Sequence, residues 1–249
     1  MIFWKKFLLG CAAVVGMLGA AQAAGGPSWD KADIDTTDQA SLQRGVKYFV
    51  NYCLNCHSAA FMRYNRLTDI GITEQQIKEH LIFTDQKVGE TMVSVLDPVQ
   101  AKAWFGVNPP DLTVIARSRA GANGTGADYL YTYLRSFYRD NTRPTGWNNV
   151  LFNNVSMPNP FWELQGEIKP VFEGDATAPV FKGWERVSSG TMPPEEFDRM
   201  VLDLVNYMTW MGEPAQNLRK IIGIFVLLFM VIFTAIAWRL NKAYWNDVK

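Results

Sequence analysis

Two cysteines and a histidine lie within five residues of this chain, in the run Cys53-Leu54-Asn55-Cys56-His57. This is the only CxxC in the sequence, and the histidine follows it directly. Thiols three positions apart stand about one helical turn apart, which suits thioether bonds to the two vinyl groups of a haem. The adjoining imidazole then reaches the iron from the same side. The motif therefore predicts a c-type haem.

Two other kinds of site use a CxxC pair. A thioredoxin-like redox pair requires a βαβ setting, and the sequence shows no such pattern. A zinc site requires four ligands, but the only other cysteine is Cys11 and the only other histidine is His80. We therefore prefer the haem interpretation.

Residues 1–23 are typical of a cleaved secretory signal peptide. Lys5 and Lys6 precede a short apolar core, and Ala21-Gln22-Ala23 forms an AxA cleavage site. Too few apolar residues precede Cys11 for a lipoprotein signal, so we expect this cysteine to leave with the leader. Export agrees with c-type haem, and both remaining thiols are then used by haem, so no disulfide is expected.

The charge distribution indicates the kind of partner. The formal net charge is zero, but residues 24–218 contain 17 Lys and Arg against 23 Asp and Glu, a net charge of −6. An acidic domain argues against nucleic acid and favours a basic protein partner.

Hydrophobic periodicity predicts a mainly α protein. Residues 24–40 are polar and are expected to form an irregular arm. Gly45 and Phe49 lie four positions apart on one predicted helix, where a glycine permits another helix to approach closely. The region 140–193 is expected to be a long loop containing strands at 166–172 and 180–187. The predicted helices are 41–52, 73–83, one starting at Asn108–Leu112, 128–139 and 195–211.

Ile221–Trp238 is an uncharged apolar run of 18 residues. At about 1.5 Å per residue this run spans roughly 27 Å, which is enough to cross a bilayer. We therefore predict a haem domain at 24–217, a transmembrane anchor at 218–240 and a tail at 241–249. Cleavage of the leader would leave the haem domain outside and the tail inside.

The second axial ligand of the iron is expected to be a methionine, as is usual in haems that only transfer electrons. Met157 and Met192 both lie in loops and are followed by proline, which keeps a strap out of a helix. Local chemistry does not separate these two methionines. His80 lies beside the apolar face of its predicted helix and is a weaker candidate.

The haem motif is part of a longer pattern. Asn51–Ser58 is followed by Phe61–Leu67, and together these runs form an extended haem motif. Further parts of the pattern are Pro109–Leu112, the Arg117/Arg119 pair before Asp128-Tyr129, and Trp210–Pro214, which leads into the C-terminal anchor. This pattern resembles the cytochrome c1 family, the haem subunits of the ubiquinol–cytochrome c reductase (bc1) complex. The resemblance covers nearly the whole mature chain and is specific when the extended haem motif and the C-terminal anchor are taken together.

The resemblance implies a class I cytochrome c core with insertions, in which the helices at 41–52 and 195–211 cross. It also implies a set of haem-binding residues. Their roles would be thioether attachment (Cys53, Cys56), proximal ligand (His57), sixth ligand (Met157), packing behind the proximal histidine (Pro109, Pro110) and propionate binding (Arg119, Tyr129). Gly121–Gly126 looks longer than the family pattern, so Arg117 and Arg119 could exchange roles.

As a bacterial cytochrome c1, the chain would be an electron carrier in the inner membrane with its haem domain in the periplasm. It would receive electrons from a Rieske iron–sulfur protein and pass them to a cytochrome c, as one subunit of a dimeric complex that also contains cytochrome b. Two rival hypotheses are a haem enzyme or gas sensor with an open sixth site, and the cytochrome c subunit of an oxidase.

Overall fold

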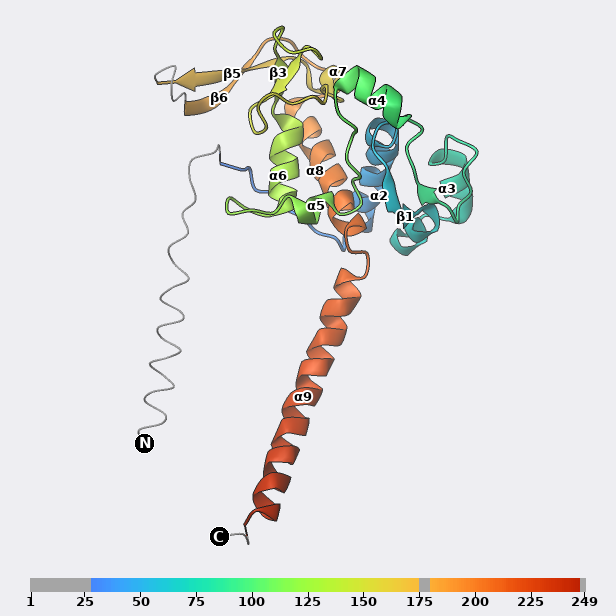
Figure 1. Ribbon diagram of the computed structural model, residues 1–249, viewed down its shortest axis with the longest axis vertical. Coiled ribbons are helices and arrows are strands. Elements are labelled where there is room, and N and C mark those ends of the chain that lie inside the picture. Colours follow the sequence, from blue (N-terminus) through green and yellow to red (C-terminus); the bar gives the residue numbers. More distant parts are fainter. Residues whose placement is uncertain (1–27, 175–179, 247–249) are drawn as a thin grey trace.

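A computed structural model describes residues 28–174 and 180–246 of the 249-residue chain (Figure 1). The described chain forms a mainly α-helical domain, from which one long helix, α9 (Gln216–Tyr244), projects. The predicted signal peptide at 1–23 and the last three residues of the predicted tail lie outside the described residues.

Two crossing helices, α2 (Gln39–Tyr48) and α8 (Pro194–Met211), form the centre of the domain. They touch at Gly45, where an added Cβ would lie 2.1 Å from the carbonyl oxygen of Asp203 and 2.6 Å from Cβ of Tyr207. Phe49 fills the crossing with its ring 5.4 Å from that of Tyr207. The predicted close approach at Gly45 is confirmed, since any side chain there would push the helices apart.

The other helices follow the predictions in part. The helix at 73–83 is present as α3 (Glu74–His80), with Thr73 and Gln76 forming a capping box. The helix predicted at 128–139 is present as α6 (Gly126–Arg135), but it ends four residues early because Phe137–Arg139 forms strand β3 instead. The helix at 41–52 is regular only to Tyr48 and continues as a π-helical turn, Phe49–Cys53.

The prediction that a helix starts at Asn108–Leu112 is wrong. This segment is irregular and lies between α4 (Pro98–Phe105) and α5 (Ile115–Ser118). Its backbone instead bonds to the haem motif, because the Leu112 N–H donates to the Ser58 carbonyl at 2.8 Å. The Asp111 carboxylate accepts from the N–H of Ala60 at 2.7 Å, so it joins two segments.

Three short antiparallel pairs complete the fold. The long region 140–193 contains the predicted hairpin, with β5 (Ile168–Glu173) paired to β6 (Val180–Arg186). Sequence periodicity did not reveal the other two pairs, whose strands have two to five residues. They are β1 (Ala59–Arg63) with β2 (Thr91–Met92), and β3 with β4 (Trp147–Asn149). A 3₁₀ helix (Tyr64–Ile70) and the single turn α7 (Trp162–Gln165) account for the remaining regular structure of the described residues.

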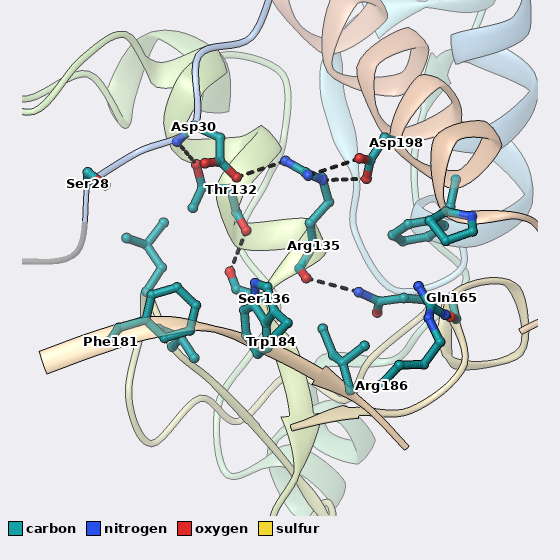
Figure 2. A pocket seen from close by; sticks show the side chains of 15 residues that line it. Ser28, Asp30, Thr132, Arg135, Ser136, Gln165, Phe181, Trp184, Arg186 and Asp198 are labelled. Atoms are coloured by element: carbon teal, nitrogen blue, oxygen red, sulfur yellow. Dashed lines mark hydrogen bonds and ion pairs between the residues drawn. The ribbon is translucent and has the colours of Figure 1, made fainter. Parts of the chain in front are cut away.

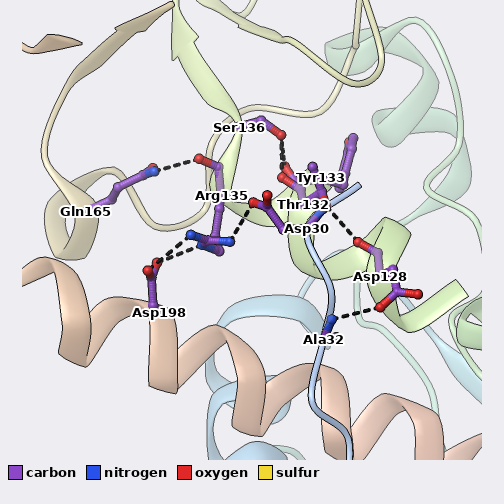
Figure 3. A network of polar contacts seen from close by, with 9 residues as sticks. All are labelled: Asp30, Ala32, Asp128, Thr132, Tyr133, Arg135, Ser136, Gln165 and Asp198. Carbon is purple, nitrogen blue, oxygen red and sulfur yellow. Dashed lines mark hydrogen bonds and ion pairs between the residues drawn. The ribbon is translucent and has the colours of Figure 1, made fainter. Parts of the chain in front are cut away.

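Residues 28–38 form an irregular arm, as predicted, and the arm is fastened to α6 by its backbone (Figure 3). The Asp30 N–H donates to Thr132 Oγ1 and the Ala32 N–H donates to Asp128 Oδ1, both at 2.7 Å. The Arg135 guanidinium pairs with Asp30 and, through two nitrogens, with Asp198 on α8. These bonds join the arm, α6 and α8.

The helix α9 is the only described helix that is long and apolar enough to cross a membrane. It extends the predicted run Ile221–Trp238 at both ends, and no residue of it is buried in the domain. A helix of 29 residues is about 43 Å long. Its length and apolar surface agree with a membrane anchor.

The junction between the domain and α9 is an ion-pair cluster around Glu213. The Glu213 carboxylate accepts from Arg219 Nε and from Arg117 Nη1, each at 2.5 Å. Asn217 on α9 also donates to the Thr36 carbonyl of the arm at 3.3 Å. The start of α9 is therefore attached to two separate segments of the domain.

We expect the Glu213 cluster to make stability pH-dependent. Hydrogen bonds from Arg219 and then from Arg117 lower the pKa of Glu213 from 4.5 to about 2. A depressed carboxylate pKa stabilises the fold fully above pH 4.5, and this contribution disappears as the pH falls from 4.5 towards 2. Glu213→Gln should therefore melt at a lower temperature at pH 7 in detergent, and the difference should shrink steadily as the pH falls from 4.5 through 2.

The control is Glu185→Gln, which removes an exposed carboxylate from the hairpin and should leave the melting temperature almost unchanged. A Glu213→Gln deficit of the same size from pH 7 to pH 2 would contradict the prediction.

Candidate haem site

The haem motif begins on a π-helical turn. Phe49–Cys53 adopts this conformation, and a further turn follows in which the N–H groups of Cys56 and His57 both donate to the Cys53 carbonyl. A π-turn widens the spacing of backbone bonds and is frequent at functional sites. The turn places Cys53, Cys56 and His57 on the lining of one cavity.

The His57 ring is held in one orientation. Its Nδ1 lies 2.8 Å from the Pro110 carbonyl oxygen, and the side chain is buried with 9% exposure. A carbonyl can only accept, so Nδ1 carries the proton and Nε2 is left with a free lone pair. Burial lowers the pKa of His57, against the opposing effects of the Pro110 bond and Asp111. A neutral, oriented imidazole is the form that binds a metal.

The two thiols do not resemble a redox pair. Burial raises the pKa of Cys53 to about 12, and burial also raises the pKa of Cys56. Redox-active CxxC cysteines have the opposite property, because they need a lowered thiol pKa to act as thiolates. The environment therefore argues against the thioredoxin-like alternative.

The cavity brings the predicted haem-binding residues together. Its volume is about 380 Å³, and its lining is mostly apolar or aromatic. Arg119 is the only Lys, Arg, Asp or Glu among the described residues that line it. All eight predicted residues are on this lining: Cys53, Cys56, His57, Pro109, Pro110, Arg119, Tyr129 and Met157.

Of the three sixth-ligand candidates, only Met157 lines the cavity formed by the described residues. Its sulfur accepts a hydrogen bond from the Tyr133 hydroxyl at 3.4 Å. Met192 lies two residues before α8, where its N–H donates to the Leu164 carbonyl and its side chain packs against the main core. His80 is on α3 with its side chain 70% exposed. The positions favour Met157.

The positions of Arg117 and Arg119 also differ, and only one of the two arginines faces the cavity. Arg119 lines the cavity with its guanidinium 5.6 Å from the ring centre of Tyr129. Arg117 is paired with Glu213 at the α9 junction. Arg119 is therefore the arginine placed to meet an anionic group in the cavity.

The loop that carries Met157 is held by two buried asparagines of β4 that sequence reasoning did not identify. Asn149 Oδ1 accepts from the N–H groups of Leu151 and Phe152, and its Nδ2 donates to the Tyr133 carbonyl. Asn148 Oδ1 accepts from the Asn154 N–H at 2.9 Å. Two neighbouring asparagines in an otherwise irregular, Asn-rich region were the only signal, and such residues are common in ordinary turns.

A second cavity, of about 430 Å³, lies among the arm, α6, the β5–β6 hairpin and α8 (Figure 2). Arg135, with its partners Asp30 and Asp198, lines one side, and Trp184 and Arg186 of the hairpin line another. None of the predicted haem-binding residues lies on this lining, as drawn from the described chain. Because the haem motif lines the first cavity, that cavity is the candidate haem site.

A profile of the Cytochrome C1 family matches residues 29–248 of the chain. The chain belongs to the cytochrome c1 family. It is 44% identical over 248 residues to cytochrome c1 of Allochromatium vinosum, and this alignment covers 98% of this chain and 99% of the relative. It is 48% identical over 219 residues to a protein named ammonia monooxygenase gamma subunit from Nitrosomonas europaea, covering 88% of each. Cytochrome c1 of Rhodospirillum rubrum is 29% identical and is covered over 98% of its length.

Family membership identifies the cofactor. Cytochrome c1 proteins carry a covalently bound c-type haem, and Cys53 and Cys56 are the cysteines available for it in the described chain. The cavity suits this group, because it offers two thiols, an oriented imidazole, a thioether, one guanidinium and walls that are otherwise mostly apolar or aromatic. Cytochrome c1 is an electron-carrying subunit of the bc1 complex, and α9 agrees with a membrane-anchored member of the family.

Proposed function

We propose that this chain carries single electrons through a c-type haem, whose iron would be held by His57 Nε2 and Met157 Sδ. The observation that carries the proposal is the shared cavity, which His57, Met157 and both motif cysteines line together. The bond from His57 Nδ1 to Pro110 leaves Nε2 as the atom with a free lone pair. Two protein ligands leave no position for a substrate, which favours electron transfer over bond-making chemistry.

The remaining cavity residues have separate roles. The haem supplies a one-electron couple when bound, and the chain positions it and excludes water. Pro110 orients His57 through its carbonyl group, and Pro109 packs beside it on the lining. Arg119, which lies over Tyr129, would give a charge-assisted bond to a haem propionate, with the Tyr129 hydroxyl as a second donor.

Within the bc1 complex, we place the chain between a Rieske iron–sulfur protein and a cytochrome c. Cytochrome b would be its third protein partner, in a complex that is dimeric as a whole. The predicted leader would place the haem domain in the periplasm, and α9 would anchor it to the inner membrane. The complex, rather than this chain alone, would be the quinol-oxidising enzyme.

The test of this function uses the complete complex. Affinity purification through a tag on this chain should also recover a cytochrome b and a Rieske protein. Quinol should then reduce the haem of this chain, and removal of the Rieske protein should abolish that reduction. Recovery with oxidase subunits instead, or haem reduction that survives loss of the Rieske protein, would overturn the assignment.

The acidic charge predicts how the electron acceptor docks. A net charge of −6 in residues 24–218 should attract a basic cytochrome c over long range. The second-order rate of electron transfer to such a cytochrome should fall as the salt concentration rises from about 10 to 200 mM, because screening shortens the range of attraction. Transfer to a small neutral oxidant is the control. An equal rate at all salt concentrations would contradict docking by charge.

A further inference from the structure

A phenol hydroxyl faces the sulfur that we assign to the iron. The Tyr133 hydroxyl lies 3.4 Å from Met157 Sδ, and this is its one hydrogen bond within the described residues. Sulfur is a weak acceptor with long bonds, so 3.4 Å is a normal length for such a contact. A phenol has an ordinary pKa of about 10 and therefore donates at neutral pH.

The position of the Tyr133 ring is fixed by an aromatic ring on each side of it in the sequence. Tyr129, one turn earlier, stacks on it with 5.9 Å between ring centres and 10° between planes. Phe137, four residues later and fully buried, meets it edge-on at 5.1 Å. The three aromatic side chains therefore form a column that directs the hydroxyl at Met157.

The loop on the other side of the contact is fixed as well. Val155 and Met157 pack with Phe137 and Trp147 in a small apolar cluster of their own. Asn149 connects the two sides, because it accepts from the loop N–H of Leu151 and donates to the Tyr133 carbonyl. The fold therefore fixes the loop backbone against α6, and the packing of Met157 beside Phe137 and Trp147 keeps its sulfur within reach of the hydroxyl.

A hydrogen bond to a thioether changes how that sulfur acts as a ligand. The donor draws electron density from the sulfur lone pairs, which makes the sulfur a poorer donor to a metal cation. The oxidised metal carries the higher positive charge and depends more on electron donation from the sulfur than the reduced metal does. The hydrogen bond therefore destabilises the oxidised state more than the reduced state. Hydrogen bonds near a metal are a general way to tune its redox potential.

We propose that Tyr133 is a positioning residue that raises the midpoint potential of the haem by donating a hydrogen bond to Met157. The proposal rests on the proposed function, in which Met157 is the sixth ligand. The hydroxyl also holds the methionine side chain at a set angle in the cavity, so the same bond orients the ligand and lowers its donor strength.

The test is a redox titration of the Tyr133→Phe variant in the assembled complex. The ring and its aromatic column remain, and only the hydroxyl is lost. A bond worth roughly 0.7 kcal/mol more to one redox state changes the oxidised-to-reduced ratio about threefold at a fixed ambient potential. At 59 mV per tenfold for one electron, this is a fall of about 28 mV. The weak red absorption band of the sulfur-to-ferric-iron bond should shift as well.

The chain contains a matched control. Tyr207 on α8 donates to Met92 Sδ at 3.6 Å, and both side chains are fully buried in the core. Neither residue lines the haem cavity in the described chain. Tyr207→Phe removes the same kind of bond from a place without a haem, so it should lower thermal stability without moving the potential or the red band.

The outcomes separate this inference from the function on which it rests. If Tyr133→Phe keeps the native potential and red band while Met157→Leu still opens the iron to carbon monoxide, the Tyr133 proposal is overturned and the electron-carrier function stands. An equal shift in Tyr207→Phe would also overturn it, because the effect would then be general. If Met157→Leu leaves the iron closed, the ligand assignment itself fails.

Discussion

Reduced complex carrying Met157→Leu is expected to bind carbon monoxide, whereas the unmodified complex is not. Leucine has nearly the volume of methionine but offers no lone pair, so the cavity stays filled while the iron loses its sixth ligand. Of the three sixth-ligand candidates, Met157, Met192 and His80, only Met157 lines the cavity formed by the described residues. The measurement is the carbon monoxide difference spectrum of reduced membranes.

The matched control for this experiment is Met192→Leu. Met192 is followed by proline like Met157, but it packs on the main core and bonds to Leu164 through its backbone. Its replacement should leave the iron closed. Carbon monoxide binding only to Met192→Leu would reverse the ligand assignment. Binding to the unmodified protein would show an open site and favour a haem enzyme or gas sensor.

Gly45→Ala is expected to destabilise the domain strongly although it adds one methyl group. The new Cβ would lie 2.1 Å from the Asp203 carbonyl oxygen, which is backbone of the crossing helix and cannot rotate away. Alanine is better than glycine in a helix by about 1 kcal/mol. Overpacking usually costs about 1–3 kcal/mol and occasionally more, and a clash between two backbones belongs at the upper end. The cost of the clash should therefore exceed the gain in helix propensity, so Gly45→Ala should lower the free energy of unfolding.

The effect can be measured as a lower midpoint in thermal or denaturant unfolding. For a domain of this size, each 1 kcal/mol shifts the melting temperature by about 2–4 °C. Gly89→Ala is the matched control, because nothing lies within 4 Å of an added Cβ at that exposed position. Its stability should change by less than about 0.5 kcal/mol. If Gly45→Ala were equally harmless, the two helices would not be in close contact at Gly45.

The crossing also relates the fold to the site. The helix α2 leads directly into the π-helical turn and Cys53, so the position of α2 against α8 sets the position of the motif. Met208 of α8 lines the haem cavity from the other helix of the pair. A change at Gly45 is therefore expected to reduce haem incorporation along with stability.

Much of the site followed from the sequence, because its chemistry depends on residues that are neighbours in the chain. The thioether spacing of Cys53 and Cys56 and the adjoining His57 are local, and the apolar runs of α8 and α9 are periodic or continuous. The spacing of Gly45 and Phe49 permitted a close approach by another helix, and the family resemblance implied which two helices cross. Local patterns of this kind survive folding because short-range geometry and side-chain polarity determine them.

The remaining features depend on contacts between distant segments, and only the tertiary structure decided them. Asn108–Leu112 carries good helix-start residues, yet its backbone bonds to Ser58 and His57 more than fifty positions earlier. Arg117 and Arg119 are indistinguishable in the sequence, but a carboxylate 96 residues away pairs with Arg117. The Tyr133–Met157 bond likewise joins a helix to a loop. Short-range patterns carry no information about such partners, because these contacts depend on how segments far apart in the sequence pack together.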